Sequence, residues 1–212
     1  MAPTFDHQLT YEKTPSYFAF QDVPKRVFDF NPKIKLIVII RDPVIRVVSQ
    51  FVQYTIRNRF IIKENKTFNA TIEFKMKVLE PNGTVLHRDY DAMIAPGRYV
   101  DHYKRWLKYF PKEQILICDG ENFIRNPYAE MLKVEKFLNL KPFYLKEHFF
   151  YDDNKGFFCL NKDLNNTKIE CMKENKGQPH PPVPDDVIEK LKEYYEPYTQ
   201  ELFEMLGEER FW

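Results

Sequence analysis

One junction constrains the fold of this chain most: five consecutive aliphatic residues, 36–40, are followed at once by Arg41, Asp42 and Pro43. An aliphatic run of this length indicates a buried strand, as in a parallel sheet. Asp42 can cap the helix that follows and Pro43 can open it, and apolar residues at helical spacing extend this helix to about Arg57. Because ligands of α/β folds bind where such strands end, the junction is also the first candidate site.

The same periodicity rules give the other elements, in which strands and helices alternate. Residues 58–91, in contrast, are polar and irregular and are predicted to form a long surface excursion. In the helix that Pro127 opens, Met131, Leu132 and Leu138 are expected to face inward. This order predicts an α/β fold with a layered parallel sheet flanked by helices. The predicted strands are 35–40 and 114–118, and the predicted helices are 24–30, 43–57, 96–110, 127–138 and 184–206, the last broken at Pro197.

Charge and composition exclude several classes of protein. Lys and Arg number 32 against 31 Asp and Glu, and the net charge of +1 excludes a broadly polycationic surface but leaves a local basic groove open. With 6 Gly against 15 Pro, the chain has little material for Gly-rich phosphate loops. Its length fits a single domain over residues 1–212. The aliphatic runs are of strand length, and the first residues lack the basic start and apolar stretch of a signal peptide.

The three cysteines occupy two different settings. Cys118 lies in an apolar run, where a buried free thiol is expected. Cys159 and Cys171 bracket a polar loop, and their spacing suits a small loop closed by a disulfide. A zinc site would need two more ligands, for which only the distant His148 and His180 are available.

Four Asn-x-Ser/Thr sequons are candidate glycosylation sites. Three of them cluster in the polar stretch before residue 91, and the fourth lies in the loop between the two cysteines. Together they favour the secretory pathway over the cytosol. Because the chain has no signal peptide, we expect it to be part of a longer protein. The acceptor residues are Asn65, Asn69, Asn82 and Asn165.

The junction at Arg41 offers a candidate anion site. A helix N-terminus presents free N–H groups and the positive end of a dipole, and Arg41 adds a fork of donors that matches phosphate. Ser49 lies two turns further along the same helix face and can donate to the same anion. The alternative interpretation pairs Arg41 with a nearby carboxylate and gives Ser49 no role. Both interpretations stay open at this point.

Two other segments could carry chemistry. Lys13 lies in a loop of ordinary composition, where a solvated side chain is the plain interpretation. Lys-Gly pairs at 155–156 and 176–177 flank the cysteine loop, where backbone N–H groups and a cation can approach phosphate. Phe157, beside the first pair, could stack a nucleobase. The alternative is the edge of an aromatic core followed by a turn.

These segments, in this order and at this spacing, resemble the sulfotransferase domain of the heparan sulfate glucosaminyl 3-O-sulfotransferases. The resemblance covers essentially the whole chain, and the stretch from Glu12 to Phe18 is its most distinctive part. The matching stretches are Glu12-Lys13-Thr14-Pro15-Ser16-Tyr17-Phe18, Arg41-Asp42-Pro43 with Arg46, Ser49 and Gln53, Trp106-Leu107, Asp119-Gly120-Glu121, Ile124-Arg125-Asn126-Pro127, Lys155-Gly156-Phe157-Phe158-Cys159, Cys171, Lys176-Gly177 and His180-Pro181.

The resemblance implies an enzyme of the α/β sulfotransferase fold, which is similar to the fold of P-loop NTPases. Such enzymes transfer a sulfuryl group from 3′-phosphoadenosine-5′-phosphosulfate (PAPS) to the 3-hydroxyl of a glucosamine in heparan sulfate. The resemblance also implies no nucleic-acid partner, no metal, and a place in the Golgi lumen on a membrane anchor outside these 212 residues. Motifs define the acceptor position poorly, so N-sulfation of heparan sulfate or another acceptor is an alternative.

The resemblance also implies roles for individual residues. Lys13 is implied to be catalytic, close to the transferring sulfuryl group, where it would neutralise charge in the transition state. Phe157 is implied to stack on adenine, and Cys159 and Cys171 to form the family's disulfide. The implied contacts of the cofactor phosphates are Arg41, Ser49, Lys176, Gly177, Gln178, Pro179 and His180. The implied contacts of the saccharide are Lys13, Thr14, Pro15, Ser16, Gln53, Ala92 and Met93.

Two departures from the family pattern bear on activity. The family's Lys- and Gly-rich phosphosulfate loop and its general-base Glu precede the stretch that begins at Glu12, yet residues 1–11 contain neither Lys nor Gly. Gln178 stands where the family usually has Arg, which replaces a charged fork with a neutral amide. We therefore expect an N-terminally incomplete domain with little activity. A non-catalytic glycan- or nucleotide-binding remnant is a further alternative.

Overall fold

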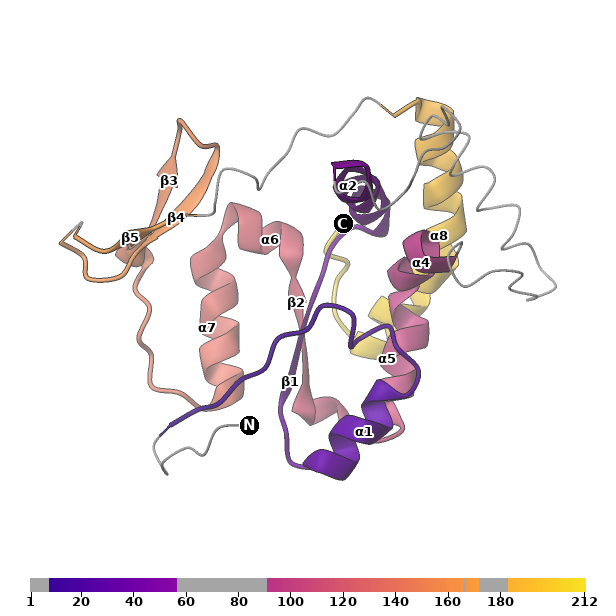
Figure 1. Ribbon diagram of the computed structural model, residues 1–212, viewed down its shortest axis with the longest axis horizontal. Coiled ribbons are helices and arrows are strands. Elements are labelled where there is room, and N and C mark those ends of the chain that lie inside the picture. Colours follow the sequence, from indigo (N-terminus) through magenta and orange to yellow (C-terminus); the bar gives the residue numbers. More distant parts are fainter. Residues whose placement is uncertain (1–7, 57–90, 166, 172–182) are drawn as a thin grey trace.

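Two parallel strands stand at the centre of the molecule, with helices on both sides (Figure 1). The computed structural model describes residues 8–56, 91–165, 167–171 and 183–212. In chain order the elements are α1 (Val23–Phe30), β1 (Leu36–Ile40), α2 (Pro43–Ile56), α4 (Asp91–Ile94), η1 (Ala95–Gly97), α5 (Tyr99–Leu107), η2 (Lys112–Gln114), β2 (Ile115–Asp119), α6 (Gly120–Arg125), α7 (Pro127–Leu138), η3 (Lys146–His148), β3 (Phe149–Asp152), β4 (Phe157–Asn161), β5 (Ile169–Glu170) and α8 (Asp185–Leu206).

The central strands pair in parallel, as the sequence predicts. Their register runs from Leu36 opposite Ile115 to Ile40 opposite Asp119. Figure 1 shows α6 and α7 on one side of the pair, and α1, α4, α5 and α8 on the other. Because both strands end at the same edge, the residues that follow Ile40 and Asp119 become neighbours in space.

The hydrophobic core has two parts. The main cluster joins one face of the strands, through Ile40 and Ile117, to Trp106 of α5 and to the C-terminal half of α8. The second cluster joins α2, α4 and α8 around Val47 and Leu191, both of which are fully buried. The helix α8 therefore contributes to both clusters and connects α2 to the rest of the fold.

The second face of β1 differs from the prediction of a wholly buried strand. Ile37 and Ile39, which point away from the main core, are 40% and 58% exposed. The helix α7 covers this side of the sheet over β2, which it contacts, but not over β1. Among the described residues, the aliphatic run is thus buried on one face only.

Three helices form where they are predicted, over 23–30, 43–56 and 127–138. The predicted helix over 96–110 is divided at Arg98 into η1 and α5. The predicted break at Pro197 is wrong, because α8 continues through this residue. Proline removes one backbone donor, but Tyr195 and Leu202 on either side of it are buried, and their packing keeps the two halves of the helix together. Residues 57–90, which contain most of the predicted surface excursion, lie outside the described residues.

The inward face of α7 is also different from the prediction. Leu132 is 36% exposed, while Glu130 and Glu135 are buried. Glu130 accepts hydrogen bonds from the Asn122 side chain (2.7 Å) and from Lys133 (2.5 Å). These hydrogen bonds make it tolerable to bury the carboxylate of Glu130. The apolar periodicity alone predicts that Leu132, and not Glu130, faces inward.

A second, antiparallel sheet lies at the outer edge of the molecule, beyond α7 (Figure 1). It has the order β3-β4-β5. No strand was predicted here, because aromatic residues follow one another at 149–151 without the alternation that marks a half-buried strand. Within the described residues, no helix combines the length and the apolarity that a membrane span needs.

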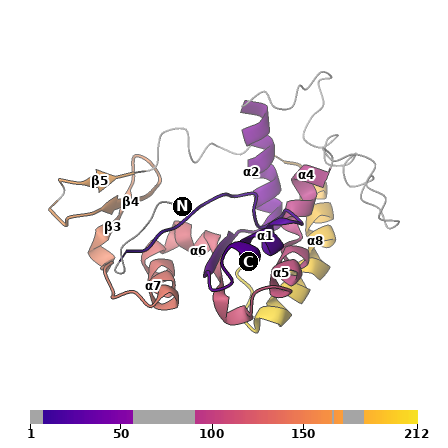
Figure 2. The ribbon, with the colours of Figure 1, turned by 60° about the horizontal axis from the view of Figure 1, so that its bottom comes forward.

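The segment that contains Lys13 continues into a stretch fixed to α5. The indole N–H of Trp106 donates to the carbonyl of Phe18 (3.1 Å), and Arg105 donates to the carbonyl of Ala19 (2.9 Å). The ring of Phe18 meets His102 edge-on, with 5.5 Å between the ring centroids. Figure 2 shows this N-terminal segment running across the molecule toward the base of α2.

The His102 imidazole is buried at this attachment and is neutral. Its Nε2 lies 3.1 Å from the carbonyl oxygen of Ala95, and its Nδ1 is bonded to Arg105, which can only donate. These contacts assign the proton to Nε2. Burial, helped by the charge of Arg105, lowers the pKa of His102 to about 4.

We expect the fold to lose stability as the pH falls below about 6.5. The unfolded imidazole takes up a proton near pH 6.5 and the folded one only near pH 4, so the contribution is fully present above 6.5 and is lost between these values. The loss is about 2 kcal/mol at pH 5. Urea unfolding of the wild type and of His102→Gln at pH 7 and pH 5 measures it. An equal loss in both proteins would contradict this assignment.

Candidate functional site

Arg41 and Glu121 meet where the two parallel strands end. Arg41 Nε lies 2.8 Å from Glu121 Oε1, and its Nη2 lies 3.3 Å from Oε2, so the carboxylate is held by two parallel hydrogen bonds. The hydroxyl of Tyr99 donates to the backbone carbonyl of Arg41 (2.9 Å), and burial raises the pKa of this tyrosine to about 12. Arg41 is therefore fixed through its backbone and through its guanidinium.

Gly120 makes this ion pair sterically possible. A Cβ atom at this position would lie 2.6 Å from Arg41 Cγ and 2.7 Å from the carbonyl oxygen of Ile40. The second contact involves backbone, which cannot move aside cheaply. A glycine directly after β2 thus allows the Arg41 side chain to cross the end of that strand and reach Glu121.

The two helices that begin at this edge are capped by the chain's own carboxylates. Asp42 Oδ1 accepts from the backbone N–H of Val44 (2.7 Å) at the start of α2. Asp119 Oδ1 accepts from the backbone N–H groups of Glu121 (2.8 Å) and Asn122 (3.1 Å) at the start of α6. The helix after β1 opens as predicted, with Asp42 as its cap.

Of the two sequence interpretations of Arg41, the structure shows the pairing with a carboxylate. Ser49 is half-buried on α2, two turns from Asp42. The Arg41 fork has a third nitrogen, Nη1, outside the two hydrogen bonds to Glu121. A phosphate at this edge would therefore share the guanidinium with Glu121. The predicted phosphate contacts at 176–180 lie outside the described residues.

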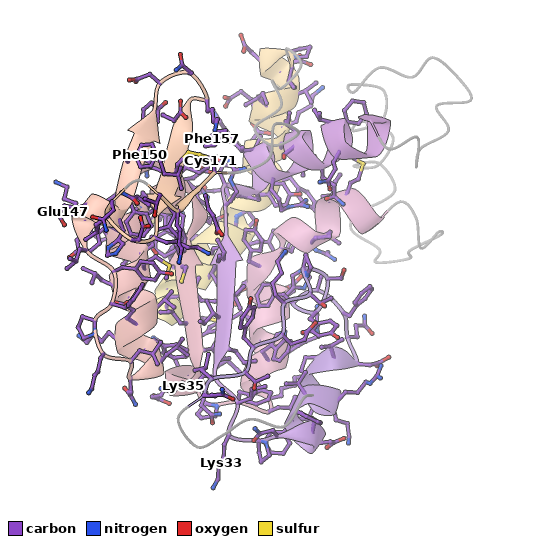
Figure 3. All side chains as sticks on the ribbon, turned by 60° about the vertical axis from the view of Figure 1, so that its left-hand side comes forward. Lys33, Lys35, Glu147, Phe150, Phe157 and Cys171 are labelled. Atoms are coloured by element: carbon purple, nitrogen blue, oxygen red, sulfur yellow. A yellow bond between two sulfur atoms is a disulfide. The ribbon has the colours of Figure 1, made fainter. Side chains whose placement is uncertain are left out.

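An apolar pocket of about 460 Å³ lies between α6 and the β3–β5 sheet. The predicted adenine partner Phe157 and both cysteines of the disulfide contribute to its wall. In Figure 3, Phe157 and Cys171 lie next to each other on this sheet. The pocket has the aromatic walls and small polar content that a flat, apolar ring requires. It is lined by Phe123, Ile124, Pro127, Phe149, Phe157, Phe158, Cys159, Leu160, Glu170 and Cys171.

The predicted cysteine chemistry is confirmed. Cys159 and Cys171 form a disulfide with their Cα atoms 4.5 Å apart, and Cys118 is free and buried. Burial raises the pKa of the Cys118 thiol to about 12, so this residue is an inert core side chain. The carboxylate of Asp152 lies close to both bonded sulfurs, but oxidation of these sulfurs removes the thiolates that a metal would need.

We expect loss of the disulfide to reduce the free energy of unfolding by about 3 kcal/mol, as chain entropy predicts for so short a loop. The comparison is between Cys171→Ser and Cys118→Ser in urea unfolding without reductant. A reductant should lower the stability of the wild type and of Cys118→Ser but not that of Cys171→Ser. A wild type that is insensitive to reductant would contradict the prediction.

The Lys13 segment is solvent-exposed. Lys13, Pro15 and Ser16 are exposed, and the hydroxyl of Thr14 donates to the carboxylate of Glu12 (2.5 Å). A turn follows, in which the backbone N–H of residue 17 donates to the carbonyl of Thr14 (3.2 Å). Lys13 is thus free to meet a ligand, on a segment that is fixed a few residues later at α5.

The remaining predicted residues are placed as follows. Gln53 is exposed on α2, whereas Met93 is fully buried in the second core cluster, so its side chain packs rather than faces a saccharide. The side chain of Ala92 lies outside the described part. Asn165 is exposed in the disulfide loop. The other three sequon residues, Asn65, Asn69 and Asn82, fall outside the described ranges.

Sequence reasoning gave no role to Gly120 and Glu121 and did not find the pocket. A signal was present, because Asp119-Gly120-Glu121 follows a strand directly, as Arg41-Asp42-Pro43 does. Parallel strands end at one edge, so two polar strand ends are expected to meet there. Which of their side chains pair depends on the crossing at Gly120, which a sequence does not reveal.

Comparison with known proteins gives consistent results. The profile of the family described as "Sulfotransferase domain" matches residues 10–206. The chain is 34% identical to mouse heparan sulfate glucosamine 3-O-sulfotransferase 5 over 99% of its own length and 58% of that protein. It is also 34% identical to human heparan sulfate glucosamine 3-O-sulfotransferase 6, over its full length and 59% of that protein. It thus spans little more than half the length of these relatives.

A solved structure has the same fold. The sulfotransferase of Alicyclobacillus acidocaldarius superimposes with a TM-score of 0.64, over 92% of this chain and 63% of that one. The sequence identity is 18%, so this likeness concerns the fold alone.

Proposed function

This chain belongs to the sulfotransferase domain family, and on that premise we propose that it binds PAPS and serves in sulfuryl transfer to the 3-hydroxyl of a glucosamine in heparan sulfate. The observation that carries the proposal is the family match over residues 10–206 together with the 34% identity to heparan sulfate glucosamine 3-O-sulfotransferases. The α/β fold and its parallel sheet agree with this family.

We propose that Arg41, Ser49 and Phe157 hold one end of PAPS. The pocket beside Phe157 has room and apolar walls for an adenine ring. Arg41 has a guanidinium nitrogen outside its pair with Glu121, and together with Ser49 it would hold the 3′-phosphate. The segment from Lys176 to His180 would wrap the cofactor phosphates. PAPS supplies the sulfuryl group, and this chain's residues hold and orient it.

The acceptor side rests on the exposed Lys13 segment. Lys13 would lie beside the group being transferred, where its ammonium offsets developing negative charge. Thr14, Pro15, Ser16, Gln53, Ala92 and Met93 are proposed to border the saccharide, although the buried side chain of Met93 leaves only its backbone for this role. Heparan sulfate is the proposed acceptor and the Golgi lumen the proposed location, with glycosylation at the sequons, including the exposed Asn165.

A non-catalytic role in binding a nucleotide or a glycan is the second candidate. It is supported by the carboxylates that the described residues place around the site, which already cap helices or pair with Arg41. In this case the chain binds the cofactor's adenosine end or the polysaccharide without turnover. N-sulfation of heparan sulfate, with the same cofactor, remains the alternative acceptor chemistry.

Arg41→Ala is expected to weaken binding of the desulfated cofactor, adenosine 3′,5′-bisphosphate, by about tenfold or more, because a hydrogen bond to a charged group contributes about 1.5–3 kcal/mol. Isothermal titration calorimetry measures the affinity. Arg210→Ala is the matched control, because Arg210 forms a similar paired fork with Glu196 on α8. Equal affinity of the two variants for adenosine 3′,5′-bisphosphate would show that Arg41 does not contact this ligand.

A further inference from the structure

The segment that joins α7 to β3 displays apolar side chains to solvent. Leu140, Phe143 and Leu145 are 44%, 64% and 50% exposed. Figure 1 shows this segment on the outer edge of the molecule, where it leads from the end of α7 to β3. Single exposed apolar residues are common, but three within six positions form a patch of the kind that marks an interaction site.

Two buried polar side chains hold this segment in place. The carboxylate of Glu135 accepts hydrogen bonds from the backbone N–H groups of Phe143 (2.9 Å) and Tyr144 (3.1 Å). Nδ1 of His148 accepts from the backbone N–H of Leu145 (2.8 Å). Both Glu135 and His148 are only 5% exposed. The outward direction of the apolar side chains is therefore built into the fold.

The surroundings of the apolar residues are basic. Lys141 and Lys146 alternate with them, and Lys136 is exposed on the last turn of α7. Lys35 Nζ bonds to the carbonyl oxygen of Phe137 and lies 5.1 Å from the centroid of its ring. This contact brings the start of β1, with the exposed Lys33, to the same side of the molecule.

Figure 3 shows the extent of this side, with Lys33 and Lys35 at its lower end and Glu147 near its upper end. Five exposed lysines thus stand against the exposed carboxylate of Glu147 in this part of the structure. Positive charge and exposed apolar groups occur together on one outer edge. A partner that covers this edge offers both negative charge and apolar groups.

We infer that Leu140, Lys141, Phe143, Leu145 and Lys146, here named the 140–146 surface, dock onto an anionic lipid bilayer. The apolar side chains enter the interface between headgroups and acyl chains, while the lysines remain at the headgroups. A sulfated polysaccharide could pair with the lysines, but it offers no hydrocarbon to cover two leucines. This inference does not depend on the proposed catalytic function.

Co-sedimentation with phosphatidylcholine vesicles, with and without phosphatidylserine, tests the inference. The wild type binds the anionic vesicles and binds the neutral ones weakly. Lys141→Glu with Lys146→Glu lowers the apparent affinity by about 30-fold or more, and Phe143→Ser with Leu145→Ser by about tenfold or more. The matched controls, Lys190→Glu with Lys192→Glu on α8 and Phe20→Ser, bind as the wild type does.

A second readout reports insertion directly. Phe143→Trp places a fluorophore at the tip of the 140–146 surface, and vesicles with brominated acyl chains quench it, whereas the same fluorophore from Phe20→Trp is not quenched. Thermal unfolding confirms that each variant is folded. The inference would be overturned if the wild type bound no vesicles, or if the fluorophores at positions 143 and 20 were quenched equally. It would also be overturned if the wild type bound heparin but not vesicles and the lysine variants lost the binding to heparin.

Discussion

The 212-residue chain is expected to transfer sulfate from PAPS to heparan sulfate about 10²-fold to 10⁴-fold more slowly than an active relative, because removal of a general base costs a rate factor of this size. The transfer needs a held donor, a polarised leaving oxygen and a base for the acceptor hydroxyl. Among these 212 residues, the Lys- and Gly-rich loop that would hold the phosphosulfate has no counterpart before Glu12.

The carboxylates that the described residues place around the site already have partners. Asp42 and Asp119 cap two helices, and Glu121 is held by both hydrogen bonds of Arg41. Glu12, the carboxylate next to Lys13, accepts from Thr14 and faces solvent. A carboxylate engaged in a cap or an ion pair would have to leave that partner before it could reach the hydroxyl of an acceptor. Residues 8–56, 91–165, 167–171 and 183–212 therefore offer no ready replacement for the family's Glu.

Radiolabelled PAPS and heparan sulfate, with mouse heparan sulfate glucosamine 3-O-sulfotransferase 5 as the active control, measure this rate. A Glu12→Gln variant shows whether any residual turnover depends on Glu12. Turnover comparable with that of the control enzyme would contradict the prediction and would mean that another residue of this chain acts as the base.

Trp106→Ala is expected to lower the free energy of unfolding by about 3–5 kcal/mol, the usual cost of deleting a large buried aromatic side chain. Trp106 is 5% exposed, packs in the main core and stacks obliquely on Phe110 with 5.8 Å between ring centroids. Its indole N–H also donates a hydrogen bond to the backbone carbonyl of Phe18. The substitution thus removes core volume and releases the segment that carries Lys13.

Trp106→Phe separates these two effects. It keeps most of the ring and loses the indole N–H, so we expect a smaller loss of about 1–2 kcal/mol from the unpaired carbonyl. Urea unfolding gives both values, and proteolysis near Lys13 reports release of the segment. If the two variants were equally stable, the core role assigned to this indole would be wrong.

The main elements of the fold follow from sequence periodicity because their apolar residues recur at the spacing of one buried face. α1 and α2 are of this kind, whereas β1 was predicted from its continuous aliphatic run and α7 from the Pro127 that opens it. The sequence did not predict that α8 continues through Pro197, because this depends on tertiary packing, which a local rule on proline does not include. The β3–β5 sheet was missed for a similar reason, because its aromatic strands are stabilised by pairing and by the disulfide.

Part of the geometry at the candidate site was predictable and part was not. Residue types indicated the end of β1 and the Phe157 segment as candidates, and the spacing of the cysteines predicted the disulfide that the structure shows. The partner of Arg41 was not predicted, because Glu121 is eighty positions away and reaches Arg41 only through Gly120. The burial of the Met93 side chain was not predicted either, because the resemblance indicated a saccharide contact and not a place in the second core cluster.

The central claim is that this chain recognises the 3′-phosphate of an adenosine nucleotide at the end of β1, beside the Phe157 pocket. Calorimetric titration with adenosine 3′,5′-bisphosphate and with adenosine 5′-monophosphate tests it most directly, because the two ligands differ only in that phosphate. We expect the bisphosphate to bind at least about tenfold more tightly than the monophosphate, because one hydrogen bond to a charged phosphate contributes this much. Equal affinity for the two ligands, or binding of neither, would contradict it.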